Sequence, residues 1–208
     1  LVLGWRPRDM DLGFLPFLKG QGIAQYTSDP VFRAMLPAPP EENPMAAAVQ
    51  FTQIFSDPGL DWARIAKIRS WTSLPIVLKG IMRADDAARA VREGYDGIMV
   101  SNHGGRQVDG GIGALDALAA IAPVVKGKIP LFFDSGIRCG ADIFKALALG
   151  AAAVGIGRPY AYGLALGGDA GVQSVMEYLL AELDLTMALN GCRTPTSITP
   201  DLLGVNHV

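Results

Sequence analysis

From residue 74 onward, short apolar runs alternate with stretches of helical periodicity. The apolar runs are too short for helices, are rich in Val, Ile and Phe, and lack polar alternation, as expected of strands buried on both faces. They lie at Leu74–Gly80, Gly97–Gly104, Ile129–Gly136 and Ala152–Pro159. The helical patterns lie at Ala84–Glu93, Leu115–Val125, Ala141–Leu149 and Val172–Leu189. This repeat of strand and helix predicts a parallel α/β sheet.

The first part of the chain has a different pattern. Residues 1–45 are rich in Pro, Gly and aromatic side chains, so they are too apolar for a disordered linker and too interrupted for a long helix. Long loops in compact domains usually form lids or binding loops, and we expect a long active-site loop here. A helix is predicted at Met45–Phe55, and another is expected to begin near Asp57–Pro58, where a capping side chain precedes a proline.

The composition narrows the class of protein. Half of the 208 residues are hydrophobic and 18% are charged, which excludes a disordered chain. The net charge of −2 argues against a nucleic-acid-binding protein, and no apolar run reaches the roughly 18–20 residues that span a bilayer. Two cysteines and two histidines supply neither a disulfide framework nor a zinc-type cluster. We therefore expect a reduced, cytoplasmic setting and no bound metal.

Polar residues cluster where the predicted strands end, at Lys79, Ser101, Asp134 and Arg158. A (β/α)8 TIM barrel gathers its active site at that end of its strands, with a phosphate site after the last two. A barrel needs eight βα units and about 250 residues, whereas four units are present here. Residues 1–208 are therefore predicted to be the C-terminal half of one barrel domain. Residues 74–159 would supply strands 5–8, residues 170–190 the C-terminal helix, and a missing segment or a second copy would complete the barrel.

The segment Ser101–Gln107 is the most specific motif for chemistry. His103 directly follows a buried strand, where an imidazole can accept a proton near neutral pH. Arg106 offers a planar fork that matches a carboxylate. An isolated His–Arg pair more often holds a loop in place, but the position at a strand end and the neighbouring motifs favour the functional interpretation. Lys79 could stabilise a developing anion, or it could extend its ammonium group into solvent.

Two further strand ends carry arginines. In the segment Asp134–Arg138, the Asp134 carboxylate can accept hydrogen bonds from sugar-like hydroxyls, and Arg138 can pair with a phosphate. Alternatively, Asp134 caps the helix that is expected near Ala141. In Gly155–Pro159, the glycines allow backbone N–H groups to approach an anion, or they allow tight packing of strand on helix. Arginines at two consecutive strand ends suit a phosphate group.

Together these motifs resemble the FMN-dependent family of enzymes that oxidise L-2-hydroxy acids. The motifs are Ser101–Gln107, Asp134–Arg138, Phe144–Ala151 and Gly155–Pro159. Within the family, the opening Leu3–Asp9 and the Pro-rich loop are most similar to lactate 2-monooxygenases, and Ser135, where many relatives have glycine, also fits the bacterial lactate-oxidising branch. Cys139 stands where relatives commonly have a second arginine, which would weaken the phosphate contacts slightly.

The resemblance implies a TIM barrel, an FMN cofactor and a role for each matching residue. His103 would take a proton from the substrate while two electrons reach flavin N5, either as a hydride or through a carbanion. Arg106 would bind the substrate carboxylate with the help of Arg6, and Lys79 would lie by flavin N1 and O2. The residues that would bind FMN are Lys79, Ser101, Asp134, Ser135, Gly136, Ile137, Arg138, Gly157 and Arg158.

The implied function is oxidation of a small L-2-hydroxy acid. The favoured reaction is that of an L-lactate 2-monooxygenase, in which lactate and O2 give acetate, CO2 and water; an oxidase or dehydrogenase would release the 2-oxo acid instead. A non-catalytic half-barrel that binds a phosphate or nucleotide is the alternative of another class, although it needs neither His103 nor Arg106. The implied partners are the N-terminal half of the barrel, without which no catalysis is expected, and further copies in a tetramer or octamer.

Overall fold

The computed structural model describes residues 16–17, 19, 21–55, 59–106 and 108–204. The chain divides into two compact units, residues 1–72 and 73–208, which we describe separately. Arg6 lies outside the described residues. No helix in the described ranges is both long enough and apolar enough to pass through a bilayer.

Among its described residues, unit 1 has helices where a loop was expected. In place of a continuous loop up to residue 45, it contains the short helices α2 (Ala24–Thr27) and α3 (Pro30–Ala34). Asp29 accepts a hydrogen bond from the backbone of the first turn of α3, and a proline follows it, which is a standard helix start. Both helices are too short for apolar periodicity to reveal them. The side chains of Ile23 and Phe32 are buried in a cluster with Ala47 and Phe51 of the next helix.

The next two helices lie close to their predicted positions. The helix expected at Met45–Phe55 is α4 (Pro44–Ile54), capped by Asn43. The second is α5 (Trp62–Ile68), which begins after the capping residue Asp61. Its expected start at residues 57–58 lies outside the described residues.

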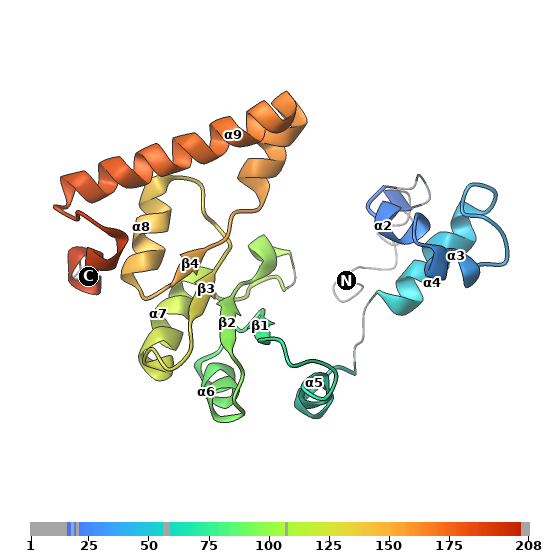
Figure 1. Ribbon diagram of the computed structural model, residues 1–208, viewed down its shortest axis with the longest axis horizontal. Coiled ribbons are helices and arrows are strands. Elements are labelled where there is room, and N and C mark those ends of the chain that lie inside the picture. The colour runs from blue at the N-terminus through green and yellow to red at the C-terminus, as the bar shows by residue number, and fades with distance from the viewer. Residues whose placement is uncertain (1–15, 18, 20, 56–58, 107, 205–208) are drawn as a thin grey trace. The chain divides into compact units, whose positions relative to one another are not determined.

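Unit 2 contains the predicted parallel sheet. Within its described residues the strands are β1 (Val77–Lys79), β2 (Gly97–Val100), β3 (Leu131–Phe133) and β4 (Ala153–Val154). They pair in the order β1-β2-β3-β4, and every pair is parallel (Figure 1). The helices between the strands are α6 (Ala84–Arg92), α7 (Ala114–Val125) and α8 (Gly140–Ala148). The α/β repeat predicted from the apolar runs is therefore confirmed.

The last helix, α9 (Arg158–Leu189), is longer than predicted. It was expected to begin near residue 172, but it starts directly after β4, with Pro159 in its first turn. Gly167 and Gly168 have non-helical backbone angles and divide it into two segments at a sharp bend (Figure 1). Glycines in this stretch weaken the helical signal in the sequence. Three 3-10 helices, His103–Gly105, Pro195–Ser197 and Pro200–Leu202, complete the described elements of this unit.

One face of the sheet is buried, whereas burial on both faces was expected. The side chains that alternate onto the helix-covered face are 0–9% exposed, namely Leu78, Ile98, Val100, Leu131 and Phe133. On the opposite face, Val77 is 41% exposed. In a closed barrel that second face is filled by side chains from other strands of the barrel. The open face therefore corresponds to the interior of a barrel of which these strands form a part.

The loop that follows β3 is held by α8 and α9. The Asp142 carboxylate accepts from the backbone N–H groups of Arg138 (2.9 Å) and Cys139 (3.2 Å). Glu182 of α9 accepts from the backbone N–H of Gly140 at 2.8 Å. A Cβ atom on Gly140 would lie 2.1 Å from the backbone nitrogen of Leu183, so this position requires glycine. These contacts fix the first turn of α8 and the loop that leads into it.

Candidate functional site

The register of the sheet brings three polar side chains to one place. Lys79 pairs with Met99, and Met99 pairs with Phe132. Ser101 lies two residues after Met99, and Asp134 lies two residues after Phe132. Because side chains two residues apart in an extended chain point to the same face, the side chains of Lys79, Ser101 and Asp134 all lie on the face that is not covered by helices. The Lys79 Nζ donates to the Ser101 Oγ at 3.0 Å and lies 3.4 Å from the Asp134 Oδ2. The Ser101 hydroxyl donates in turn to the Asp134 Oδ1.

Asp134 is ionised and is the centre of this network. Partial burial raises the pKa of the Asp134 carboxyl. The hydrogen bonds from Ser101 and Ser135 and the positive charge of Lys79 lower it by more, so the pKa lies below its ordinary value. Asp134 does not cap α8, because the N-cap residue of that helix is Cys139, whose backbone N–H donates to the Asp142 carboxylate. Lys79 is about half exposed, but it is paired with Asp134 rather than extended into solvent.

His103 stands at the start of the 3-10 turn that follows β2. Its backbone has a φ of 57°, in the left-handed region that side chains other than glycine rarely adopt. The His103 N–H donates to the Ser101 Oγ at 3.1 Å, and the following N–H, of Gly104, donates to the Ser135 Oγ at 3.0 Å. The strained turn is thus bonded to two serine hydroxyls.

The surroundings of the His103 imidazole favour its neutral form. Burial lowers the pKa of His103, and the positive charges of Lys79 and Arg106 lower it further; the Asp134 carboxylate opposes them without reversing the shift. A neutral imidazole at pH 7 can accept a proton. The surroundings of His103 therefore suit a general base.

A pocket of about 420 Å³ connects this turn with the ends of β3 and β4. Its lining includes His103, Arg106, Asp134, Ser135, Arg138 and Arg158. Lys79 and Ser101 join the same site through their contacts with Asp134. The described residues predicted to bind cofactor or substrate are thus gathered around one cavity.

One end of the pocket is built to hold an anion. Gly157 precedes the first turn of α9, and no side chain among the described residues caps that helix start, so its N–H groups are available to a ligand. Arg138 and Arg158 line the same pocket. The Arg158 guanidinium lies against Gly104, where an added Cβ would be 3.0 Å from Nη1. Two guanidinium groups beside a helix start match the charge and geometry of a phosphate.

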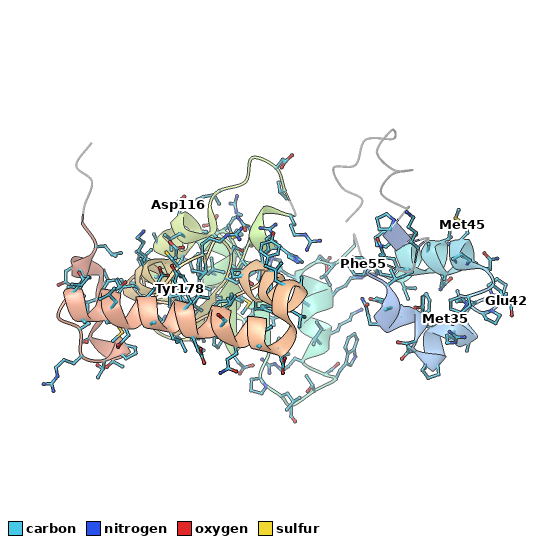
Figure 2. All side chains as sticks on the ribbon, turned by 90° about the horizontal axis from the view of Figure 1, so that it is seen from above. Met35, Glu42, Met45, Phe55, Asp116 and Tyr178 are labelled. Carbon is cyan, nitrogen blue, oxygen red and sulfur yellow. The ribbon has the colours of Figure 1, made fainter. Side chains whose placement is uncertain are left out.

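Sequence reasoning missed several residues that shape this site. Asn102 accepts from the Gly105 N–H at 3.0 Å and so closes the turn that carries Arg106. Asp142 and Glu182 hold the loop between β3 and α8. The spacing Cys139-x-x-Asp142 is a capping-box pattern and could have revealed Asp142. The role of Glu182 depends on a contact between distant segments, for which the sequence carries no local signal. On the same helix, its neighbour Tyr178 is exposed (Figure 2), and its hydrogen bond to Glu182 raises the pKa of the phenol.

Comparisons with known proteins point to one family. The family model described as FMN-dependent dehydrogenase matches residues 1–205. The chain is 48% identical over 205 residues to the FMN-dependent alpha-hydroxy acid dehydrogenase qulF of Penicillium citrinum, covering 97% of this chain and 51% of that protein. It is 48% identical over 191 residues to an L-lactate oxidase of Lysinibacillus sphaericus, covering 92% and 49%.

The structural comparison agrees with the sequence comparison. A flavocytochrome b2 variant with sulfite bound superposes with a TM-score of 0.71 at 38% identity, over 76% of this chain and 42% of that one. The parallel sheet of unit 2 is accordingly part of a TIM barrel, as predicted. The chain spans about half the length of the curated relatives it matches.

Proposed function

The chain belongs to the FMN-dependent dehydrogenase family, and from that premise we propose that it supplies the FMN- and substrate-binding part of an enzyme that oxidises a small L-2-hydroxy acid. The family, its FMN cofactor and its oxidoreductase class are those predicted from the sequence. The observation that carries the proposal is the presence of a neutral imidazole, His103, and a carboxylate-binding group, Arg106, in the pocket that also holds the anion-binding end.

The residues of the pocket fit FMN. Arg138, Arg158 and the start of α9 would hold its phosphate, and Asp134 would accept from the ribityl hydroxyls. Lys79 would place a positive charge beside the ring, and Ser101 would contact the same edge. When bound, FMN supplies the acceptor for two electrons.

The protein's own groups do the remaining chemistry. Arg106 would bind the substrate carboxylate through two parallel hydrogen bonds, which fixes the orientation of the acid. The His103 imidazole would accept one proton from the substrate, and the second proton and the electron pair would pass to FMN, so that the substrate becomes a 2-oxo acid. Because Lys79 and Arg106 disfavour the protonated imidazole, His103 is poised to give this proton up again once the product departs.

We further propose L-lactate as the substrate and a monooxygenase outcome. The sequence similarity of the opening Leu3–Asp9 to lactate 2-monooxygenases and the serine at position 135 support this choice. Two of the relatives that match are named as an FMN-dependent alpha-hydroxy acid dehydrogenase and an L-lactate oxidase, which supports release of the 2-oxo acid as the alternative.

Anaerobic addition of L-lactate to the assembled, FMN-loaded protein, followed by admission of air, tests whether the protein oxidises a 2-hydroxy acid and which product it releases. We expect the yellow flavin absorbance to bleach and to return when air is admitted. Acetate without hydrogen peroxide would support the monooxygenase, and accumulated peroxide with pyruvate would support the oxidase. An FMN-loaded protein that no 2-hydroxy acid reduces would contradict the proposed function.

Replacing Gly104 with alanine should weaken FMN binding. The variant places a side chain at a φ of 68° and a Cβ 3.0 Å from the Arg158 Nη1, so the guanidinium has to shift by a few tenths of an ångström. Gly105→Ala is the matched control, because Gly105 has a φ of 77° but nothing within 4 Å of its Cβ position. Both variants should lose about 1 kcal/mol of stability from the backbone. Gly104→Ala alone should raise the Kd for FMN, by about 10-fold, which is the value of one weakened charge-assisted hydrogen bond. Equal Kd values for the two variants in a fluorescence titration would refute the role given to Arg158.

The remaining proposals concern partners and compartment. We propose that the N-terminal half of the barrel, from the same or a second polypeptide, covers the open sheet face, which the exposure of Val77 supports. We also propose a homo-oligomer, a tetramer or an octamer, which is supported by apolar side chains exposed on α9, such as Leu185 (60%) and Leu189 (79%). The free thiols of Cys139 and Cys192 support a reducing compartment such as the cytoplasm.

A further inference from the structure

The backbone of His103 is held on both sides by serine hydroxyls that share one acceptor. The N–H of His103 itself donates to the Ser101 hydroxyl, and the N–H of the next residue, Gly104, donates to the Ser135 hydroxyl. The Ser135 hydroxyl donates to the Asp134 Oδ1 at 2.7 Å, and the Ser101 hydroxyl donates to the same oxygen. Asp134 is thus connected to both peptide groups of His103.

Ser135 occupies a position where a serine is disfavoured. Its φ of 91° lies in the region that glycine adopts freely and side chains rarely do. The next residue, Gly136, also has a positive φ of 84°. A residue in such a conformation costs free energy and persists where its side chain makes contacts that outweigh the strain. Here those contacts are the bonds of its hydroxyl to Asp134 and to the turn that carries His103.

We propose that Ser135 is a positioning residue for His103. Its hydroxyl connects the end of β3 to the turn after β2 and keeps the left-handed backbone of His103 in place, so that the imidazole faces the substrate. This inference rests on the proposed function, since it assumes that His103 takes a proton from a 2-hydroxy acid. It adds a second duty to a residue that the family resemblance associates with FMN alone.

Arg106 has a separate anchor, which makes the proposal testable. The turn that leads to Arg106 is closed by the Gly105 N–H, which donates to the side-chain oxygen of Asn102 at 3.0 Å and to its backbone carbonyl at 3.1 Å, and not to Ser135. Loss of the Ser135 hydroxyl should therefore disturb proton transfer more than carboxylate binding. Loss of the Asn102 amide should do the opposite.

The test compares Ser135→Gly with Ser135→Ala in the assembled, FMN-loaded protein. Both variants lack the hydroxyl, but glycine removes the strain at φ 91° and alanine keeps it. In anaerobic stopped-flow measurements with L-lactate, both should slow flavin reduction by the same factor, about 3- to 10-fold, which corresponds to one hydrogen bond. The Kd for lactate obtained from the same traces should change less than the rate. The thermal midpoint of the glycine variant should exceed that of the alanine variant.

The outcomes separate this inference from the proposed function. If the wild-type protein is reduced by lactate and Ser135→Gly is reduced equally fast, the proposed function stands and the positioning role is overturned. If the glycine variant keeps the wild-type rate and the alanine variant alone is slow, backbone conformation rather than the hydroxyl matters, which also overturns it. An Asn102→Ala variant that slows flavin reduction without raising the Kd for lactate would show that any loosening of the turn slows proton transfer. That result would also overturn the positioning role of Ser135. A wild-type protein that no 2-hydroxy acid reduces would overturn both proposals.

Discussion

Replacing His103 with glutamine is expected to slow reduction of the bound flavin by about 10²- to 10⁴-fold, the usual contribution of a general base. Glutamine is polar and of similar size, but its amide accepts no proton in the physiological range. The contacts proposed for FMN come from other residues, Arg138 and Arg158 among them, so the variant should remain yellow. Anaerobic stopped-flow absorbance with L-lactate measures the rate, and the absorbance of the purified protein measures FMN content.

The pH dependence of the same reaction provides the control. The base must be unprotonated to act, so kcat/KM should be constant at high pH and should fall as pH decreases through the pKa of His103. Burial and the charges of Lys79 and Arg106 lower that pKa from the ordinary 6.5, so the decline should begin at a lower pH than for a free imidazole. The residual rate of His103→Gln should not show this decline.

The same variant decides between the enzyme and a half-barrel that only binds a phosphate or nucleotide. A binding module has no use for the proton acceptor, so in such a protein the substitution would change no reaction. Unchanged turnover in the variant would contradict the role proposed for His103, and loss of FMN instead of loss of rate would assign the residue to binding.

The sheet and the gathering of the site residues could be predicted from the sequence for a physical reason. Strands buried by helices are continuous apolar runs, and the ends of parallel strands meet at one edge. A polar residue directly after such a run, such as Lys79 or Asp134, therefore has to reach the same region.

The contacts that complete the site could not be predicted in this way. The bond between Ser135 and the Gly104 N–H joins two loops that are 31 residues apart, and it depends on two unusual backbone conformations. The short helices before Pro44 pack against a small apolar core, and α3 is also capped by Asp29, so no apolar periodicity announces them. The start of α9 was missed because its glycines, which allow the bend at Gly167 and Gly168, resemble a loop.

Replacing Asp134 with asparagine should have the second largest effect, because this carboxylate connects Lys79 to the turn of His103 and is the group proposed to accept from the ribityl hydroxyls of FMN. Asparagine keeps the shape but removes the charge and turns one acceptor oxygen into a donor, which then faces the hydroxyls of Ser101 and Ser135 or the ammonium of Lys79. The loss of a charge-assisted hydrogen bond is about 1.5–3 kcal/mol. We therefore expect the Kd for FMN to rise about 10- to 100-fold and the unfolding free energy at pH 7 to fall by a similar energy. Fluorescence titration and urea unfolding measure the two quantities.

The sign of the pH dependence distinguishes this role from a general loss of packing. The pKa of Asp134 is lower in the folded protein than in the unfolded chain, so its contribution to stability is present above the unfolded value of 3.8 and is lost as pH falls through the folded value. The difference in stability between the wild-type protein and Asp134→Asn should therefore shrink as the solution is acidified. Asp116→Asn is the matched control: Asp116 lies exposed in the first turn of α7 (Figure 2), where the same change should lower stability by about 0.5 kcal/mol and leave FMN binding unaltered. A difference for Asp134→Asn that stayed constant down to pH 3 would mean that shape, and not the charge that orders the network, makes this residue important.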